Sequence, residues 1–232
     1  MDHKKLFEGA DWDALLRKYK DVGYCTLDLD IGKSAISEPT RTSEANLASK
    51  VKMGASFDGF DALRTFRGKD IEQIMALLIM RGSINLDNLN GQIVDFGTGS
   101  GSGAYILKQY GDNVIGIDTS ESKIQRAREL GIFTPETGIT GDGFEYLASL
   151  SPESVDFVSA FMMDRSFSHG KLYDASQKVL KKDGQLLITG GLVELKDELQ
   201  STVGKHGKVE DVITVHLDGK SYSNVAFTYT KR

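Results

Sequence analysis

Cysteine is almost absent from the sequence, because Cys25 is the single one among 232 residues. One thiol cannot form a disulfide within the chain or a thiolate zinc cluster, and this scarcity is typical of a reducing compartment. The longest apolar run, near Leu77, is far too short to cross a bilayer. The N-terminus carries charged residues with no apolar stretch behind them, unlike a signal peptide. We therefore expect a cytoplasmic protein with no membrane partner.

An excess of positive charge is also missing. The chain has 28 basic and 33 acidic side chains, which gives a net charge of −5, and no region of it is net basic. Proteins that follow nucleic-acid phosphates usually carry a basic face or stripe. Nucleic acid is therefore not the partner we expect, and a small-molecule partner agrees better with the charge balance.

Only three prolines occur, and no low-complexity linker marks a domain boundary. The pattern of the sequence nevertheless changes near residue 90, where short irregular amphipathic pieces give way to regular elements. The clearest early element is a helix beginning at Asp70, where Gln73 completes a capping box, and ending before Gly82. We divide the chain into an N-terminal helical cap or lid, residues 1–69, and a second domain, residues 70–232.

Strands and helices alternate after residue 90, which predicts right-handed crossovers and a parallel sheet with helices on both faces. The tail departs from this alternation, because Asp218-Gly219 between two strand-like segments predicts an antiparallel hairpin. The expected fold class is α/β, a doubly wound, mostly parallel seven-stranded sheet that ends in an antiparallel hairpin. The expected strands are residues 92–96, 113–117, 137–140, 154–161, 185–189, 211–217 and 224–230, and the expected helices are 103–110, 120–130, 144–150, 172–180 and 194–203.

A glycine-rich loop follows the first of these strands. Gly97, Gly99, Gly101 and Gly103 alternate with small polar residues at a strand-to-helix junction, where a ligand can lie against backbone amides. Asp118 ends the next strand, and a carboxylate there can accept hydrogen bonds from ribose hydroxyls. Two kinds of cofactor are consistent with this pattern, because the loop also matches the G-x-G-x-x-A pattern of nicotinamide-binding sites.

The order of these residues resembles the class I S-adenosylmethionine-dependent methyltransferases, whose signature is an apolar strand, an acidic residue and then G-x-G-x-G. Asp95 and the following glycines match it, and the resemblance covers residues 91–191 but does not reach 1–69. It implies a Rossmann-like methyltransferase fold and S-adenosylmethionine as the cofactor. The cofactor-binding residues that the resemblance implies come from four segments. They are Asp95, near the methionine amino group, with Gly97, Thr98 and Gly99 of the loop; Asp118, the ribose-binding acid, with Thr119; Asp142, Gly143 and Phe144 of the adenine-contacting loop; and Phe161 beside the adenine or methionine portion.

Several of these residues also have a purely structural interpretation. Asp95 could order the loop by accepting backbone N–H groups, with only indirect contact to the cofactor. Asp118 could cap the following helix, since aspartate is a good N-cap residue. Asp142 could shape the turn between Gly141 and Gly143.

Methyl transfer from a sulfonium is an in-line displacement, so the protein mainly aligns the reactants and excludes water. A base is needed only when the acceptor is a protonated hydroxyl or ammonium group. The segment after the fourth strand, residues 161–169, has neither an N-P-P-Y nor a D-P-P-Y sequence, and it has no cysteine for covalent attack. Its candidate catalytic residues are Asp164 and His169.

The first hypothesis is a methyltransferase that moves a methyl group from S-adenosylmethionine to an oxygen or nitrogen atom of a small molecule. Two alternatives remain: a catalytically silent S-adenosylmethionine-binding partner subunit, and a nicotinamide-dependent oxidoreductase. Residues 1–69 are surplus to the sheet, and Gly54, Gly59 and Gly68 punctuate them. We expect this segment to act as a mobile lid that determines the choice of acceptor.

Overall fold

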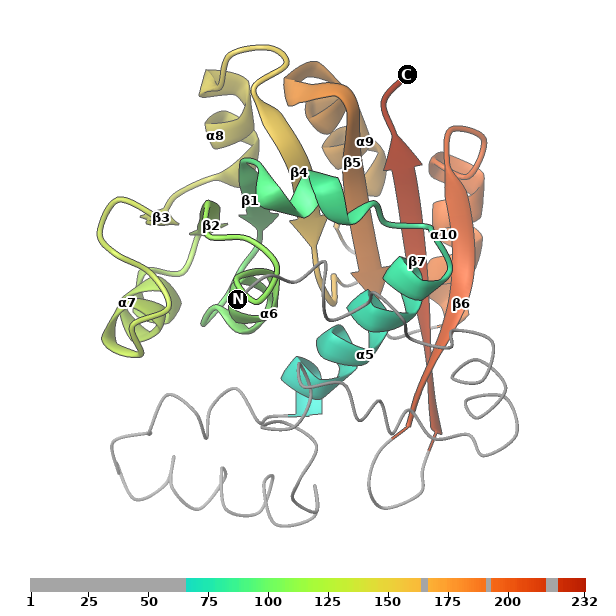
Figure 1. Cartoon of the computed structure of the whole chain (residues 1–232), viewed down its shortest axis with the longest axis horizontal. Helices are drawn as coiled ribbons and strands as arrows, with labels where there is room; N and C mark the ends of the chain where they lie inside the picture. The colour runs from blue at the N-terminus through green and yellow to red at the C-terminus, as the bar shows by residue number, and fades with distance from the viewer. Residues whose placement is uncertain (1–65, 164–166, 191–192, 216–220) are drawn as a thin grey trace.

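The computed structural model describes residues 66–163, 167–190, 193–215 and 221–232 (Figure 1). Most of the expected lid and the candidate residue Asp164 lie outside these ranges. The helices are α5 Phe66–Met80, η1 Leu86–Asn90, α6 Ser102–Leu107, α7 Glu121–Glu129, α8 Gly143–Ser149, α9 His169–Val179 and α10 Val193–Thr202. The strands are β1 Ile93–Phe96, β2 Val114–Asp118, β3 Gly138–Thr140, β4 Val155–Ala160, β5 Leu180–Gly190, β6 Lys208–Val215 and β7 Ser221–Thr230.

The strands form one seven-stranded sheet in the order β3-β2-β1-β4-β5-β7-β6. The pairs from β3 to β5 are all parallel, with Val94 opposite Ile115 of β2 and Val158 of β4. The last strand, β7, runs antiparallel to both β5 and β6. The doubly wound, mostly parallel sheet with its terminal antiparallel hairpin is therefore confirmed, while the Asp218-Gly219 turn lies outside the described residues.

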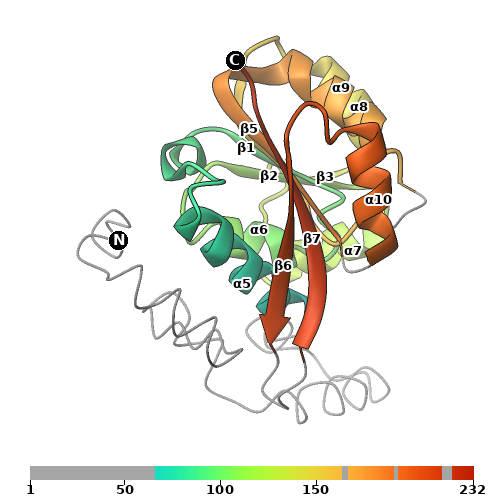
Figure 2. The same cartoon turned by 90° about the vertical axis from the view of Figure 1, so that its right-hand side faces the viewer.

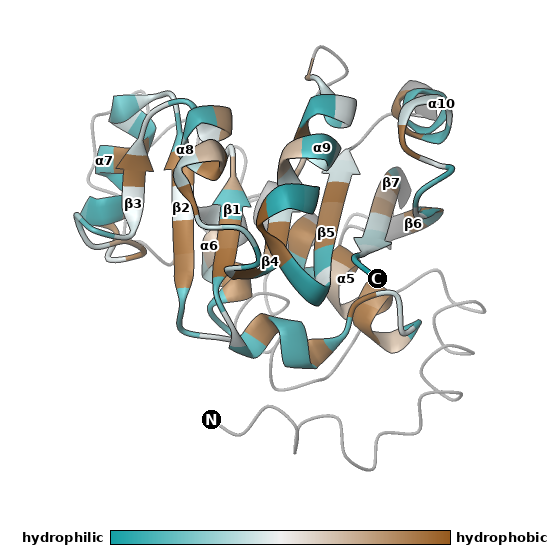
Figure 3. Cartoon of the chain, turned by 90° about the horizontal axis from the view of Figure 1, so that it is seen from above, coloured by the Kyte–Doolittle hydropathy of each residue, from teal (hydrophilic) through white to brown (hydrophobic). Residues whose placement is uncertain are grey.

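Helices cover both faces of the sheet and bury a separate core on each side (Figure 2). On one face α5 and α6 pack against the sheet through residues such as Ile74 and Leu107, which belong to the same core as Phe157 of β4. On the other face α8, α9 and α10 bury Leu147, Leu172 and other apolar side chains. Figure 3 shows the same division as brown, hydrophobic strands between helices that carry teal, hydrophilic residues. Burial of these apolar faces is the main force that holds the layers together.

Several elements differ from their expected bounds by a few residues. Helix α5 begins at Phe66, four residues before the expected start, so Asp70 lies inside the helix instead of capping it.

Two further differences change how named residues are interpreted. Helix α9 begins at His169, three residues before the expected start, so His169 is helical instead of lying in a loop. Strand β5 begins at Leu180 and takes in Asp183-Gly184, which were expected to form a turn before it. The strand is irregular at this point. Asp183 has a left-handed φ of 64°, and the register between β4 and β5 shifts between Val155 and Phe157.

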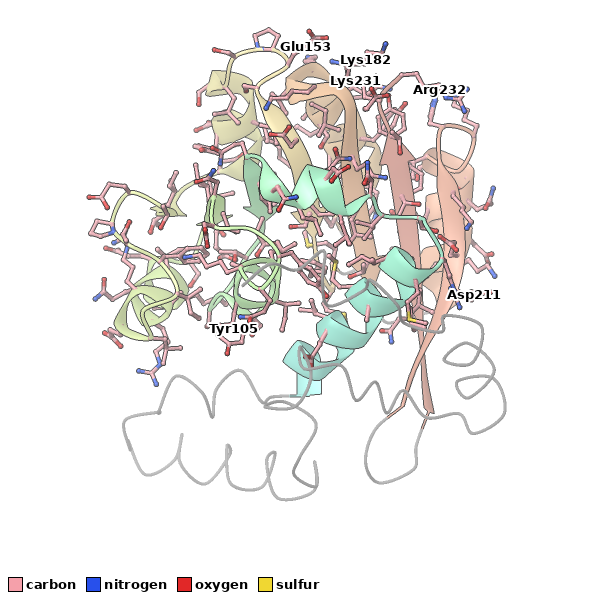
Figure 4. The ribbon with its side chains drawn as sticks, viewed as in Figure 1. Tyr105, Glu153, Lys182, Asp211, Lys231 and Arg232 are labelled. Atoms are coloured by element: carbon pink, nitrogen blue, oxygen red, sulfur yellow. The ribbon has the colours of Figure 1, made fainter. Side chains whose placement is uncertain are left out.

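The two edges of the sheet differ in character. The arrows of β1, β4 and β5 point toward the edge at which α5 begins (Figure 1), so the carboxyl ends of these strands lie there. The charged side chains Glu153, Lys182 and Lys231 lie at the opposite edge (Figure 4). Lys231 forms an ion pair of 3.4 Å with Glu153 there. Ligands of open α/β sheets bind outside the carboxyl ends of the strands, so the first edge is the one to search for a site.

Gly111 offers a test of the packing between η1 and the end of α6. A Cβ atom at Gly111 would lie 1.8 Å from the backbone oxygen of Leu89, which cannot move without displacing η1. We expect Gly111→Ala to lower the free energy of unfolding by about 1–3 kcal/mol, as overpacking does. Gly170→Ala is the matched control, because a Cβ there meets nothing within 4 Å. Urea unfolding should show that the control is neutral or stabilising, and equal losses for both variants would contradict the prediction.

Candidate active site

The glycine-rich loop turns sharply between β1 and α6. Gly97, Gly99 and Gly101 have φ values of 67°, 59° and 88°, a region that residues with a side chain rarely occupy. Thr98 anchors the loop to the neighbouring strand, because its N–H donates to the Ile117 carbonyl over 3.0 Å. Gly97 is exposed, and the nearest atom to a Cβ built at Gly99 is Lys123 Cδ at 4.0 Å. The side of the loop that Gly97 and Gly99 expose is therefore open to a ligand.

Asp95 lies beneath this loop, with 1% of its surface exposed. Its carboxylate accepts hydrogen bonds from Thr98 Oγ1 at 2.5 Å and from Ser159 Oγ of β4 at 2.7 Å, and the Ala104 backbone adds another. Burial is the largest influence and raises the pKa of Asp95 to about 6, against the lowering effect of these hydrogen bonds. In this structure Asp95 thus orders the loop from below, and its contact with the cofactor stays a prediction.

Asp118 lies at the carboxyl end of β2, beside the loop. Its Oδ2 accepts the Gly99 N–H and its Oδ1 accepts the Ser120 N–H, both over 2.9 Å. The carboxylate therefore joins the glycine loop to the start of α7. Ser120 is the N-cap of α7, so Asp118 supports the helix from two residues further back. Each carboxylate oxygen has more than one lone pair, so these bonds leave acceptor capacity for a ligand.

The third predicted segment begins α8. Asp142 is its N-cap, and Oδ1 accepts the N–H groups of Phe144 at 2.7 Å and Glu145 at 3.1 Å. Gly143 is needed for close packing, because a Cβ there would lie 2.4 Å from the ring of Phe96. The rings of Phe96, Phe144 and Phe167 form an aromatic cluster, with centroids 4.9 to 5.8 Å apart. This cluster joins β1, α8 and the segment before α9.

The end of β4 completes the surroundings of the loop. Phe161 is buried, and its ring lies 2.5 Å from where a Cβ of Gly103 would be, so it packs under the start of α6. Met163 lies on the other side, where its Cε and Sδ atoms are 3.4 and 3.5 Å from a Cβ position at Gly97. Thr119, the remaining predicted ligand, follows Asp118 directly and is exposed. The structure thus brings the loop, the end of β2 and the end of β4 together.

His169 occupies a different environment from the one expected. Its side chain has no exposed surface, and Nδ1 lies 2.7 Å from Glu198 Oε1 of α10. Its Nε2 atom is buried without a hydrogen-bond partner among the described residues. The pair fastens α9 to α10, and a covered side chain can reach an acceptor only after its neighbours move. The catalytic roles of His169 and Asp164 stay predictions.

Sequence reasoning missed two polar residues that support the site, Ser159 and Thr189. Both are fully buried in strands β4 and β5 that are otherwise apolar in this region. A hydroxyl in such a strand needs a partner, and that contrast is the signal that could have identified them. Within the described part of the chain, no three His, Cys, Asp or Glu side chains are grouped to hold a metal ion, and no helix is long and apolar enough to cross a membrane.

Comparisons with known proteins agree with this geometry. Residues 94–188 match the family described as a methyltransferase domain. A search among curated protein sequences finds no significant match. Among solved structures, an S-adenosylmethionine-dependent methyltransferase of Archaeoglobus fulgidus has a TM-score of 0.53 at 15% identity, over 80% of this chain and 99% of its own. A precorrin 8w decarboxylase of Methanobacterium thermoautotrophicum has a TM-score of 0.52 at 19% identity, over 68% and 90% of the two chains.

The fold and the glycine loop define the class of this protein. The sheet order, the antiparallel β7 and the loop between β1 and α6 are those of the class I methyltransferase fold. Residues 94–188 are a methyltransferase domain, and S-adenosylmethionine is the methyl donor of this class of enzyme. At the identities given above, the structural neighbours show the shared fold and carry no information about the acceptor.

The buried carboxyl of Asp95 makes stability depend on pH. The pKa of Asp95 is about 6 in the folded chain and near 3.8 without the protein environment. Between these values the folded state retains a proton that the unfolded state has released, so this contribution is complete below about pH 4 and lost as the pH rises through 6. We expect Asp95→Asn to remove that dependence, a relative change of roughly 2–3 kcal/mol between pH 4 and pH 7.

Urea unfolding at several pH values measures this difference. Asp174→Asn is the control, because Asp174 is an exposed carboxyl on α9. Its unfolding free energy should follow that of the parent across the range. Parallel curves for the parent and Asp95→Asn would show that Asp95 does not titrate in this window.

Proposed function

We propose that the enzyme transfers the methyl group of S-adenosylmethionine to an oxygen or nitrogen atom of a small molecule. The observation that carries the donor site is the 2.9 Å hydrogen bond from the Gly99 N–H to Asp118 Oδ2. It joins the loop that would receive the methionine portion to the carboxylate that would receive the ribose hydroxyls. These two parts come from different strands, and this contact fixes their spacing.

The residues present are consistent with such a donor. An exposed Gly97 and the space above Gly99 leave room that side chains at those positions would fill. In the proposal, Gly97, Thr98 and Gly99 line the methionine portion, with Asp95 holding the loop from below. Asp118 accepts hydrogen bonds from the ribose hydroxyls, and the Thr119 hydroxyl can donate one to the ribose. Asp142, Gly143 and Phe144 lie beside the adenine. Phe161 supports the start of α6 beneath the site.

The bound donor would supply an activated methyl group, so the work left to the chain is alignment and exclusion of water. The loop and Asp118 are held by backbone and side-chain hydrogen bonds before any ligand arrives, which favours precise alignment. Where the acceptor carries a proton, we propose Asp164 ahead of His169 as the group that takes it. In the sequence Asp164 directly follows Met163, a residue of the site, whereas His169 is covered and bonded to Glu198.

Two observations support a small-molecule acceptor: the negative net charge of the chain and the place at which helix α5, where the N-terminal segment ends, begins. The net charge of −5 provides no general attraction for a polyanion. Helix α5, whose first residues end the segment 1–69, begins at the edge toward which β1 and β4 point (Figure 1). We propose that this segment covers the acceptor and determines its choice.

The two competing functions lead to different expectations. A nicotinamide-dependent dehydrogenase commonly has the strand order 3-2-1-4-5-6, whereas here β7 inserts antiparallel between β5 and β6. A silent partner subunit would bind the donor without turnover. A turnover assay distinguishes the enzyme from the silent subunit: S-adenosylmethionine is supplied with each of a panel of small hydroxyl and amine compounds, and formation of S-adenosylhomocysteine is measured. If the protein binds S-adenosylmethionine but forms no S-adenosylhomocysteine with any compound, the silent subunit is favoured.

Calorimetric titration with S-adenosylhomocysteine tests the donor site. We expect the parent to bind and Asp118→Ala to bind roughly 10- to 100-fold more weakly, because hydrogen bonds to a charged group contribute about 1.5–3 kcal/mol. Because Asp118 also accepts two backbone N–H groups, we expect the same variant to lose about 1–3 kcal/mol of stability.

Asp118→Asn is the matched control for that experiment. The amide keeps the shape and one acceptor oxygen, so its affinity should fall between those of the parent and Asp118→Ala. Equal affinity of Asp118→Ala and the parent would overturn the placement of the ribose. No binding by the parent at millimolar ligand would overturn the donor site as a whole.

Limited proteolysis with trypsin tests the proposed cover. Cleavage within residues 30–69, for example at Lys50 or Lys52, should be rapid in the free enzyme. It should slow at least severalfold when S-adenosylhomocysteine and a reactive acceptor are both present. Lys205, exposed between α10 and β6, provides an internal control whose cleavage should not change. Equal rates at Lys50 with and without ligands would favour a static cap.

A further inference from the structure

The chain makes an unusual turn immediately after β4. Met162 has a φ of 54°, a left-handed conformation that non-glycine residues rarely adopt. Neither glycine nor asparagine occupies the position, so local sequence preference does not explain the turn. Something in the surrounding structure must hold it.

Thr189 of β5 holds this turn with two hydrogen bonds. The Met162 N–H donates to Thr189 Oγ1 over 3.0 Å, and the Met163 N–H donates to the Thr189 carbonyl over 2.9 Å. Thr189 itself has no exposed surface, so its hydroxyl cannot exchange this partner for bulk water. The next residue, Gly190, lets the turn approach, because a Cβ there would lie 2.9 Å from the Met163 carbonyl oxygen.

The turn determines where the Met163 side chain lies. Parallel pairing of β4 with β5 ends at Ala160 and Ile188, and the left-handed residue then redirects the chain. The thioether of Met163 thereby comes to the exposed Gly97, with Cε 3.4 Å and Sδ 3.5 Å from the Cβ position. These atoms lie beside the exposed face of Gly97, against which the methionine portion of a donor would rest.

We propose that Thr189 is a positioning residue of the donor site, which acts by holding the Met162 turn so that the Met163 thioether forms a wall against the bound donor. This inference rests on the proposed function. Met163 is the residue that touches the donor, through dispersion contacts with its methionine portion. Thr189 touches neither donor nor acceptor, so its effect on binding passes through Met163.

Binding of S-adenosylhomocysteine to three threonine variants tests the proposal. Thr189→Val keeps the shape but removes the hydroxyl, and we expect it to raise the Kd about three- to tenfold. Thr189→Ser keeps the hydroxyl and should bind within about twofold of the parent. Thr228→Val is the matched control, because Thr228 is a buried strand threonine on β7. Its Kd should stay within about twofold of the parent, and melting temperatures of all variants show how much each one destabilises the fold.

A double-mutant cycle with Met163→Ala separates positioning from general destabilisation. Met163→Ala alone should raise the Kd about three- to tenfold. If Thr189 acts through Met163, Thr189→Val should then change the Kd by less than about 1.5-fold in the Met163→Ala background. Independent, multiplying effects of the two substitutions would overturn the proposal, as would an unchanged Kd of Thr189→Val. Loss of binding in the parent itself would instead contradict the proposed function.

Discussion

The carboxylate of Asp95 is the interaction on which the site depends. A loop with three glycines in left-handed conformations has a high conformational entropy when free, and it must be held in one shape to receive a ligand. Asp95 accepts hydrogen bonds from Thr98 within the loop and from Ser159 on the adjacent strand β4. One buried group thus joins β1, β4 and the loop. Its desolvation raises its pKa, and the fold tolerates this because the bonds restore part of the lost solvation.

Two further hydrogen-bonding groups, Asp118 and Thr189, also join neighbouring strands around the loop. Asp118 holds Gly99 from the side of β2, and Thr189 holds the end of β4 from the side of β5. Each bond joins segments that are far apart in sequence but adjacent in the sheet. The ends of four parallel strands are therefore fixed relative to one another before any ligand binds, which reduces the ordering that binding would require.

Much of this arrangement follows from local sequence patterns. The strands 93–96 and 155–160 were predictable because short, mainly apolar runs flanked by turn residues are typical of buried parallel strands. The glycine loop and Asp118 were predictable because their spacing depends on a strand, a turn and a helix of ordinary length. The burial of His169 was not, since it depends on Glu198, which lies 29 residues further along the chain.

The turn at Met162 was unpredictable for a related reason. The expected strand ends at residue 161, but nothing in the local sequence marks Met162 as left-handed, and the contacts that hold it come from Thr189, 27 residues away. The start of β5 shows the converse, because Asp183-Gly184 has the composition of a turn yet remains within a strand. The Asp183 N–H donates to the Lys231 carbonyl over 2.8 Å there, so pairing with the chain after β7 extends the strand. Distant partners decide the outcome in both places.

The position of β7 also constrains the order of events during synthesis. Its neighbour β5 is complete at Gly190, but β7 begins only at Ser221, so one edge of β5 has no partner until that later segment has left the ribosome. An unpaired strand edge is a site for wrong pairing with other chains. β6 and β7 pair with each other through a local hairpin register, which forms faster than contacts between distant segments. Pairing along this edge of β5 therefore has to wait until the segment that begins at Ser221 is available.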